Sequence, residues 1–155
     1  MDIINTLTEK SLAKYFDHTF LKAYATRADF EKLCKEAREL GTAMVAINSA
    51  QVRVCKELLK GCDVHVGAAI SFPLGQTVLE IKVEETKKAI QDGSDEIDYV
   101  INIGEAKMGH WDYIKRKCVR ITEICRAHKV ISKVIFENCY LEKEEIKKLA
   151  EIAKR

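Results

Sequence analysis

Short apolar segments typical of strands alternate with longer amphipathic segments along this chain, and this alternation limits its possible folds more than any other feature. The amphipathic segments place apolar side chains three and four residues apart, as on the buried face of a helix. Strands that alternate with helices of this length form a parallel sheet with right-handed crossovers. The chain is therefore predicted to be an α/β protein. The expected strands are residues 15–20, 43–48, 63–72, 94–104 and 131–137.

Capping residues predict where several of the helices begin. Thr26 and Asp29 have capping-box spacing before a first long helix, and a glycine follows its last apolar residue. Ser49 is expected to cap the next helix, and the pair Thr77 and Glu80 to open the third as a full capping box. Further helices are expected at residues 7–14, 111–125 and 146–153.

Two architectures fit this order of elements: an open doubly wound sheet, or part of a (βα)-barrel. The open sheet usually carries a glycine-rich phosphate turn after its first strand, and no such turn follows residues 15–20. The pattern therefore favours the barrel slightly. A nucleotide-binding module on an open sheet is the weaker alternative.

Composition excludes several classes of function. The 155 residues are 47% hydrophobic, enough for one domain with a core. The net charge is +2 with no basic block, so nucleic acid is not an expected partner. No apolar run is long enough for a membrane span and no signal peptide is evident, so a cytoplasmic protein is expected. The six cysteines form no C-x-x-C pair, so neither a metal site nor a disulfide framework is expected.

A carboxylate and a lysine are predicted to meet inside the sheet. Side chains alternate along a strand, so Glu96 and Asp98 lie on the face opposite the more apolar Ile97 and Tyr99. The same alternation in residues 131–137 places Lys133 on the inward face. If these consecutive strands are neighbours, Asp98 and Lys133 point inward side by side, within hydrogen-bonding or one-water distance.

Two interpretations of this pair remain open from the spacing alone. It is either a buried ion pair without chemistry, or a proton-transfer pair, because closely coupled Asp and Lys side chains can exchange protons near neutral pH. Asp17 is a third polar residue among apolar neighbours in the first strand. Capping of a turn and a role in a site are about equally compatible with its position.

Four motifs that contain these residues resemble the successive strand motifs of the deoxyribose-phosphate aldolases. They run collinearly along the chain, from about Leu12 to Lys154: YFDHTFLK, SFPLGQT, SDEIDYVINIGEAKMG and SKVIFENCYL. The resemblance implies a TIM-barrel (βα)8 fold and a class I aldolase. Such an enzyme forms a Schiff base between a lysine and acetaldehyde, and the enamine attacks glyceraldehyde 3-phosphate to give 2-deoxyribose 5-phosphate, reversibly. It needs no cofactor.

The resemblance also assigns roles to residues of this chain. Asp98 matches the aspartate of a proton relay, Lys133 the lysine on the fifth strand beside that relay, and Asp17 an aspartate that organises the site. Leu21, in the first of these motifs, and Phe72, in the second, are expected to contact substrate. Three positions depart from the common pattern, with Ala46 for cysteine, Ser49 for proline and Asn138 for threonine.

The same resemblance places the Schiff-base lysine on the sixth strand, in a K-T-S-T-type motif, and a second relay lysine on the seventh. A complete barrel needs roughly 250 residues, so residues 1–155 are expected to form a single partial barrel domain of about five βα units of eight. The leading prediction is a deoxyribose-phosphate aldolase truncated before its nucleophile and inactive alone. The alternative is a non-catalytic half-barrel that serves as a binding or assembly module.

Open sheet edges imply an associating chain. The expected partners are small phosphorylated sugars and aldehydes, and either a second copy or a missing C-terminal part. Apolar side chains on the barrel-facing side are also expected to meet water; these are Met44, Ala46, Val100 and Ile135.

Overall fold

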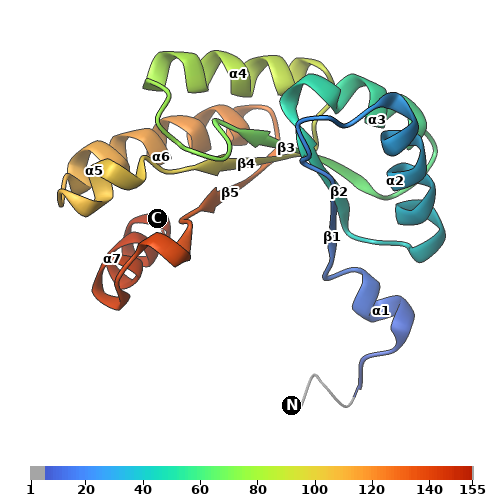
Figure 1. Ribbon diagram of the computed structural model, residues 1–155, viewed down its shortest axis with the longest axis horizontal. Helices are drawn as coiled ribbons and strands as arrows, with labels where there is room; N and C mark the ends of the chain where they lie inside the picture. The colour runs from blue at the N-terminus through green and yellow to red at the C-terminus, as the bar shows by residue number, and fades with distance from the viewer. Residues whose placement is uncertain (1–5, 155) are drawn as a thin grey trace.

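Strands and helices alternate through residues 6–154, the part of the chain that the computed structural model describes (Figure 1). The five strands are β1 (Asp17–Thr19), β2 (Met44–Asn48), β3 (His65–Ile70), β4 (Glu96–Val100) and β5 (Ile131–Ile135). The α-helices are α1 (Glu9–Ala13), α2 (Arg27–Leu40), α3 (Val52–Leu58), α4 (Leu79–Gln91), α5 (Ile103–Lys107), α6 (Trp111–Ala127) and α7 (Lys143–Ala153). Short 3-10 helices span Ser49–Gln51 and Asn138–Tyr140.

The strands form one parallel sheet in the sequential order β1-β2-β3-β4-β5. Helices α2, α3, α4 and α6 lie along one side of this curved sheet (Figure 1). A doubly wound sheet reverses its strand order and carries helices on both faces, whereas successive βα units of a barrel keep one order and one helical side. The predicted barrel-type α/β fold is thus confirmed, with five strands in place, and the open-sheet alternative is wrong.

The core lies between the sheet and the helices because strand side chains alternate between the two faces. On β4, Ile97 and Tyr99 are buried in the same apolar cluster as Ile121 and Cys125 of α6. Free cysteines act here as small hydrophobic side chains. All six cysteines are unpaired with one another, and four of them are buried: Cys34, Cys55, Cys118 and Cys125.

Of the three helix starts predicted from capping residues, one is confirmed and two are wrong. Asp29 accepts hydrogen bonds from the backbone nitrogen and the hydroxyl of Thr26, at 2.7 Å each. Ser49 caps no α-helix; it opens a 3-10 helix, and its hydroxyl donates to Glu85 Oε1 on α4 at 2.7 Å. The third helix begins at Leu79 after Val78, so Thr77 lies before the capping position and forms no box with Glu80.

Strand β4 is shorter than predicted because a polar side chain ends it. The Asn102 side chain accepts a hydrogen bond from the backbone nitrogen of Glu105 at 3.2 Å. Asparagine is favoured at such a helix N-cap because its oxygen satisfies a free backbone donor. The short helix α5, absent from the sequence-based prediction, therefore begins just beyond the strand.

The barrel-facing side of the sheet is less exposed than predicted. Met44 and Val100, expected to meet water, are fully buried, whereas Ala46 and Ile135 are partly buried. A Cβ at Gly67 would lie 2.5 Å from Met44 Sδ, so the end of the Met44 side chain occupies the space that a side chain at residue 67 would fill. Gly75, in the turn after β3, has φ +66°, and a Cβ there would overlap the backbone carbonyl of Ile101. This turn therefore packs directly against the backbone that follows Val100.

Candidate active site

One ammonium group and three carboxylates meet on the barrel-facing side of the sheet. Lys133 Nζ lies 2.9 Å from Glu96 Oε2, 3.1 Å from Asp17 Oδ2 and 3.4 Å from Asp98 Oδ1. The thioether sulfur of Met44 is 3.3 Å from the same nitrogen. We call Asp17, Glu96, Asp98 and Lys133 the Lys133 cluster. It brings together all three residues that the sequence predicted as catalytic.

Strand register places the cluster. Asp98 and Lys133 are direct partners in the parallel pairing of β4 with β5, so their side chains leave the sheet on the same face. Their predicted proximity is confirmed. Asp17 belongs to β1, four strands along in the sheet order from β5. The sheet curves enough for the long lysine side chain to reach across its concave side to that aspartate.

Glu96, and not the predicted partner Asp98, is the closest carboxylate to Lys133. Its side chain is only 10% exposed, and its second oxygen, Oε1, is 2.7 Å from Nδ1 of His65 at the start of β3. The spacing did contain a signal, because Glu96 precedes Asp98 by two residues and so shares its face. The spacing gives no distances, so it does not show which of the two carboxylates, Glu96 or Asp98, lies closer to Lys133.

Burial dominates the electrostatics of Asp98. Its side chain is 15% exposed, and removal from water raises the pKa of this carboxyl from 3.8 to about 6, against the opposing attraction of the Lys133 charge. Within residues 6–154, the buried Oδ1 atom has an ion-pair neighbour in Lys133 but no hydrogen bond. Asp98 can therefore take up and release a proton near neutral pH, as a general acid or base must.

Lys133 is held in its charged form. Partial burial favours the neutral amine, but the hydrogen bond to Glu96 and the charge of Asp98 outweigh that effect and raise the pKa of the ammonium above its ordinary value. A protonated amine has no lone pair to attack a carbonyl. Lys133 is suited to orienting carboxylates and balancing charge, and unsuited to being a nucleophile.

The two predicted substrate-contacting residues follow the carboxyl ends of their strands. Leu21 lies two residues beyond β1 and Phe72 two residues beyond β3, both partly buried. Glu85 Oε2 accepts a hydrogen bond from the backbone nitrogen of Ser71 at 3.0 Å, which holds the turn before Phe72. Active sites of barrel enzymes open at this end of the strands. The substrate contacts of both residues stay predictions.

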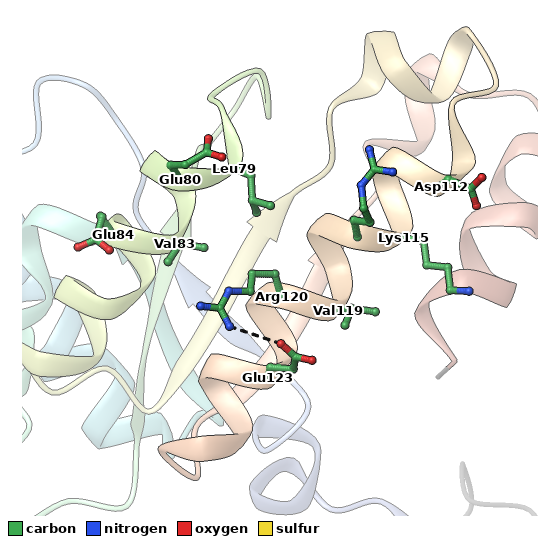
Figure 2. Close-up of a pocket in the computed structure, with 10 residues that line it drawn as sticks. Leu79, Glu80, Val83, Glu84, Asp112, Lys115, Val119, Arg120 and Glu123 are labelled. Atoms are coloured by element: carbon green, nitrogen blue, oxygen red, sulfur yellow. Dashed lines mark ion pairs between the residues drawn. The ribbon is translucent and has the colours of Figure 1, made fainter.

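A second concave site lies elsewhere in the described residues. It is an open groove of about 770 Å³ between α4 and α6, where Leu79 and Val83 of α4 supply apolar side chains and the exposed Val119 of α6 is a further lining residue (Figure 2). Its rims carry charged side chains, among them the surface ion pair of Arg120 with Glu123 at 3.5 Å. The groove lies on the helical side of the sheet, so it takes no part in the Lys133 cluster.

Residues 6–154 contain neither a cluster of metal ligands nor a helix that could span a membrane. No group of three or more His, Cys, Asp or Glu side chains in residues 6–154 is arranged to hold a metal ion. Nor does any helix within that range have the length and apolarity needed to cross a membrane.

Solved structures support the barrel architecture. A tetrameric deoxyribose phosphate aldolase from Aeropyrum pernix superimposes with a TM-score of 0.88 at 24% identity, over 96% of this chain and 62% of that one. The aldolase QR15 superimposes with a TM-score of 0.84 at 32% identity, over 90% of this chain and 62% of that one. The five strands thus correspond to part of a larger aldolase fold.

Sequence relatives carry one common name. Deoxyribose-phosphate aldolase from Lactobacillus acidophilus is 54% identical over 147 residues, which is 95% of this chain and 62% of the relative. The enzyme of that name from Bacteroides thetaiotaomicron is 48% identical over 153 residues, 99% of this chain and 64% of the relative. The chain therefore spans less than two thirds of the length of these relatives. A family model described as DeoC/LacD family aldolase matches residues 11–154, and the chain belongs to this aldolase family.

Proposed function

We propose that this chain provides the acid–base part of a deoxyribose-phosphate aldolase active site. The reaction is the reversible cleavage of 2-deoxy-D-ribose 5-phosphate to D-glyceraldehyde 3-phosphate and acetaldehyde. The observation that carries the proposal is the pairing of Asp98 with Lys133 on the concave side of the sheet, in a chain with relatives of that name. A protonated imine withdraws electrons better than the parent carbonyl, so this chemistry needs no cofactor.

Each member of the Lys133 cluster has a distinct proposed role. Asp98 carries the proton, because its pKa of about 6 allows both protonation states near neutrality. Lys133 remains an ammonium group that orients Asp98 and balances the carboxylates. Asp17 holds Lys133 from the opposite edge of the sheet. Leu21 and Phe72 contact the substrate at the carboxyl ends of the strands.

The nucleophile of the proposed reaction is not among these 155 residues. By the family resemblance it is a lysine on the sixth strand of the barrel, and residues 1–155 form a single partial domain that contains five strands. We propose that the 155-residue chain is inactive by itself for this reason. The complete site is proposed to act on small phosphorylated sugars and aldehydes in the cytoplasm.

A second candidate function, a non-catalytic assembly module, is favoured by the sheet edges. Strands β1 and β5 each pair with only one neighbour within the described residues. Unpaired backbone groups on such edges can bind another strand. The partner is then a second copy of the chain or a segment with the remaining strands.

Retro-aldol turnover separates the two functions. Purified chain is incubated with 2-deoxyribose 5-phosphate, alone and after fusion to the C-terminal part of the Lactobacillus acidophilus relative, and acetaldehyde is measured. The aldolase proposal expects turnover from the fusion alone, with loss of turnover on Asp98→Asn. Folded fusion protein without turnover would favour the assembly module.

A further inference from the structure

The Glu96 carboxylate joins the Lys133 cluster to a histidine outside it. Glu96 Oε2 binds Lys133 Nζ at 2.9 Å, and Oε1 accepts from His65 Nδ1 at 2.7 Å. The His65 side chain is 46% exposed at the first residue of β3, whereas Glu96 is 10% exposed. Both oxygens of the largely buried Glu96 carboxylate are thus bound, one by His65 at the amino end of the sheet and the other by Lys133 on its concave side.

This double contact restricts where Lys133 lies. The ammonium group is shared among Asp17 from β1, Glu96 and Asp98 from β4, with the Met44 sulfur of β2 beneath it. Asp98 has the longest of the three ion pairs, at 3.4 Å, and its buried Oδ1 accepts no hydrogen bond from any described residue. If Lys133 moves slightly toward Glu96, the ion pair of Lys133 with Asp98 is therefore weakened more than its other ion pairs.

We propose that His65 is a positioning residue for Asp98. By holding Glu96 Oε1, it keeps the carboxylate from turning both oxygens toward Lys133, and so leaves the ammonium group within reach of Asp98. The inference rests on the proposed function in one respect, namely that Asp98 is the proton carrier. The coupling itself rests on these contacts alone.

Removal of the imidazole has a definite expected sign. In His65→Ala, Glu96 retains Lys133 as its partner and draws it away from Asp98. The positive charge that stabilises the ionised Asp98 carboxylate is then farther away. The pKa of Asp98 then rises above its value of about 6. The expected rise is roughly 0.5 or more, which reflects a small movement of one charge in a partly buried site.

Two matched variants separate positioning from a general effect. In His65→Asn, the amide nitrogen is as many bonds from the backbone as Nδ1 and can donate to Glu96 without carrying a charge, so the Asp98 pKa is expected to stay unchanged. His110 also binds a glutamate, with Nδ1 at 2.6 Å from Glu105 Oε2, but outside the cluster. His110→Ala removes a similar pair and is expected to leave Asp98 unaffected.

The measurement is a carbon-13 NMR titration of side-chain carboxyls in the 155-residue chain, with the Asp98 signal assigned by its absence in Asp98→Asn. A higher pKa in His65→Ala, restored in His65→Asn, supports the inference. An unchanged pKa in folded His65→Ala overturns it, as does an equal rise in His65→Asn or in His110→Ala. The readout requires no turnover, so failure of the aldolase proposal in the activity assay leaves this test intact.

Discussion

Lys133 on the last strand and Asp17 on the first strand are 3.1 Å apart, although β2, β3 and β4 lie between their strands. A flat sheet separates β1 from β5 by roughly 19 Å at the usual strand spacing, too far for an ion pair. The sheet is therefore strongly curved, as the wall of a barrel is. The ion pair closes the concave side and links the two edges of the sheet through side chains.

Loss of Lys133 is expected to destabilise the chain, because three carboxylates then lose their common cation. Lys133→Met keeps the stem of the side chain and removes its charge. We expect its free energy of unfolding to fall by about 1–3 kcal/mol, less than for a fully buried pair because the side chain is 37% exposed. Urea denaturation measures the change.

The matched control is Lys147→Met, which removes an exposed ion pair with Glu144. Its expected effect is below about 0.5 kcal/mol, as is typical of surface pairs. Equal losses from the two variants would mean that the Lys133 cluster contributes no more to stability than an ordinary surface pair.

The raised pKa of Asp98 predicts how stability changes with pH. The pKa is about 6 in the folded chain and 3.8 in the reference state, so the folded chain binds more protons between these values. The contribution of Asp98 is fully present below pH 4 and is lost as pH rises through 6, by about 2–3 kcal/mol in all. Asp98→Asn lacks this loss, so its stability relative to wild type should improve between pH 4 and 7.

Chemical or thermal denaturation across that pH range provides the measurement. Glu151→Gln serves as the control, because Glu151 is exposed in an ion pair with Lys148. Its difference from wild type should vary little over the same range. An Asp98→Asn difference that stays constant with pH would contradict the assignment of a raised pKa to Asp98.

Lys133 is expected to resist Schiff-base trapping. The chain is incubated with acetaldehyde and borohydride, and adducts are mapped by mass spectrometry after proteolysis. Because the ammonium form of Lys133 is stabilised by Glu96 and Asp98, no specific adduct should form there. Lys133→Arg, which keeps the charge, should show the same adduct pattern as wild type. A single dominant adduct on Lys133 would assign the nucleophile to this chain after all.

Open strand edges predict self-association. Ile131 directs its backbone N–H toward β4, where it donates to Asp95, so the N–H of the next residue, Ser132, points to the open side of β5. Light scattering should give a mass above the 17.6 kDa of one chain. Ser132→Pro removes the outward donor and should lower that mass. A sharp monomer before substitution would show that five strands suffice for an isolated domain.

Much of this architecture could be predicted from the sequence, because alternation and helical periodicity are local properties. They located the strands and placed Asp98 and Lys133 on one face. Which of the two β4 carboxylates lies closer to Lys133 depends on side-chain conformation, and the contact of Glu96 with His65 depends on the pairing of β3 with β4, so neither was predicted. Burial of Met44 likewise depends on the space above Gly67 in a neighbouring strand. The helix start at Ser49 was misplaced because the Ser49 hydroxyl binds Glu85, a long-range contact that capping preference does not reveal. The third helix begins two residues after Thr77.

The most direct test of the central claim is the rate of 2-deoxyribose 5-phosphate cleavage by this chain fused to the C-terminal part of the Lactobacillus acidophilus relative. We expect cleavage by the fusion, none by the 155-residue chain alone, and a loss of about 100-fold or more when Asp98 is replaced by asparagine, the usual scale for removal of a general acid or base. A folded fusion whose cleavage rate is unchanged by Asp98→Asn would contradict the claim that the Lys133 cluster carries the proton of this reaction.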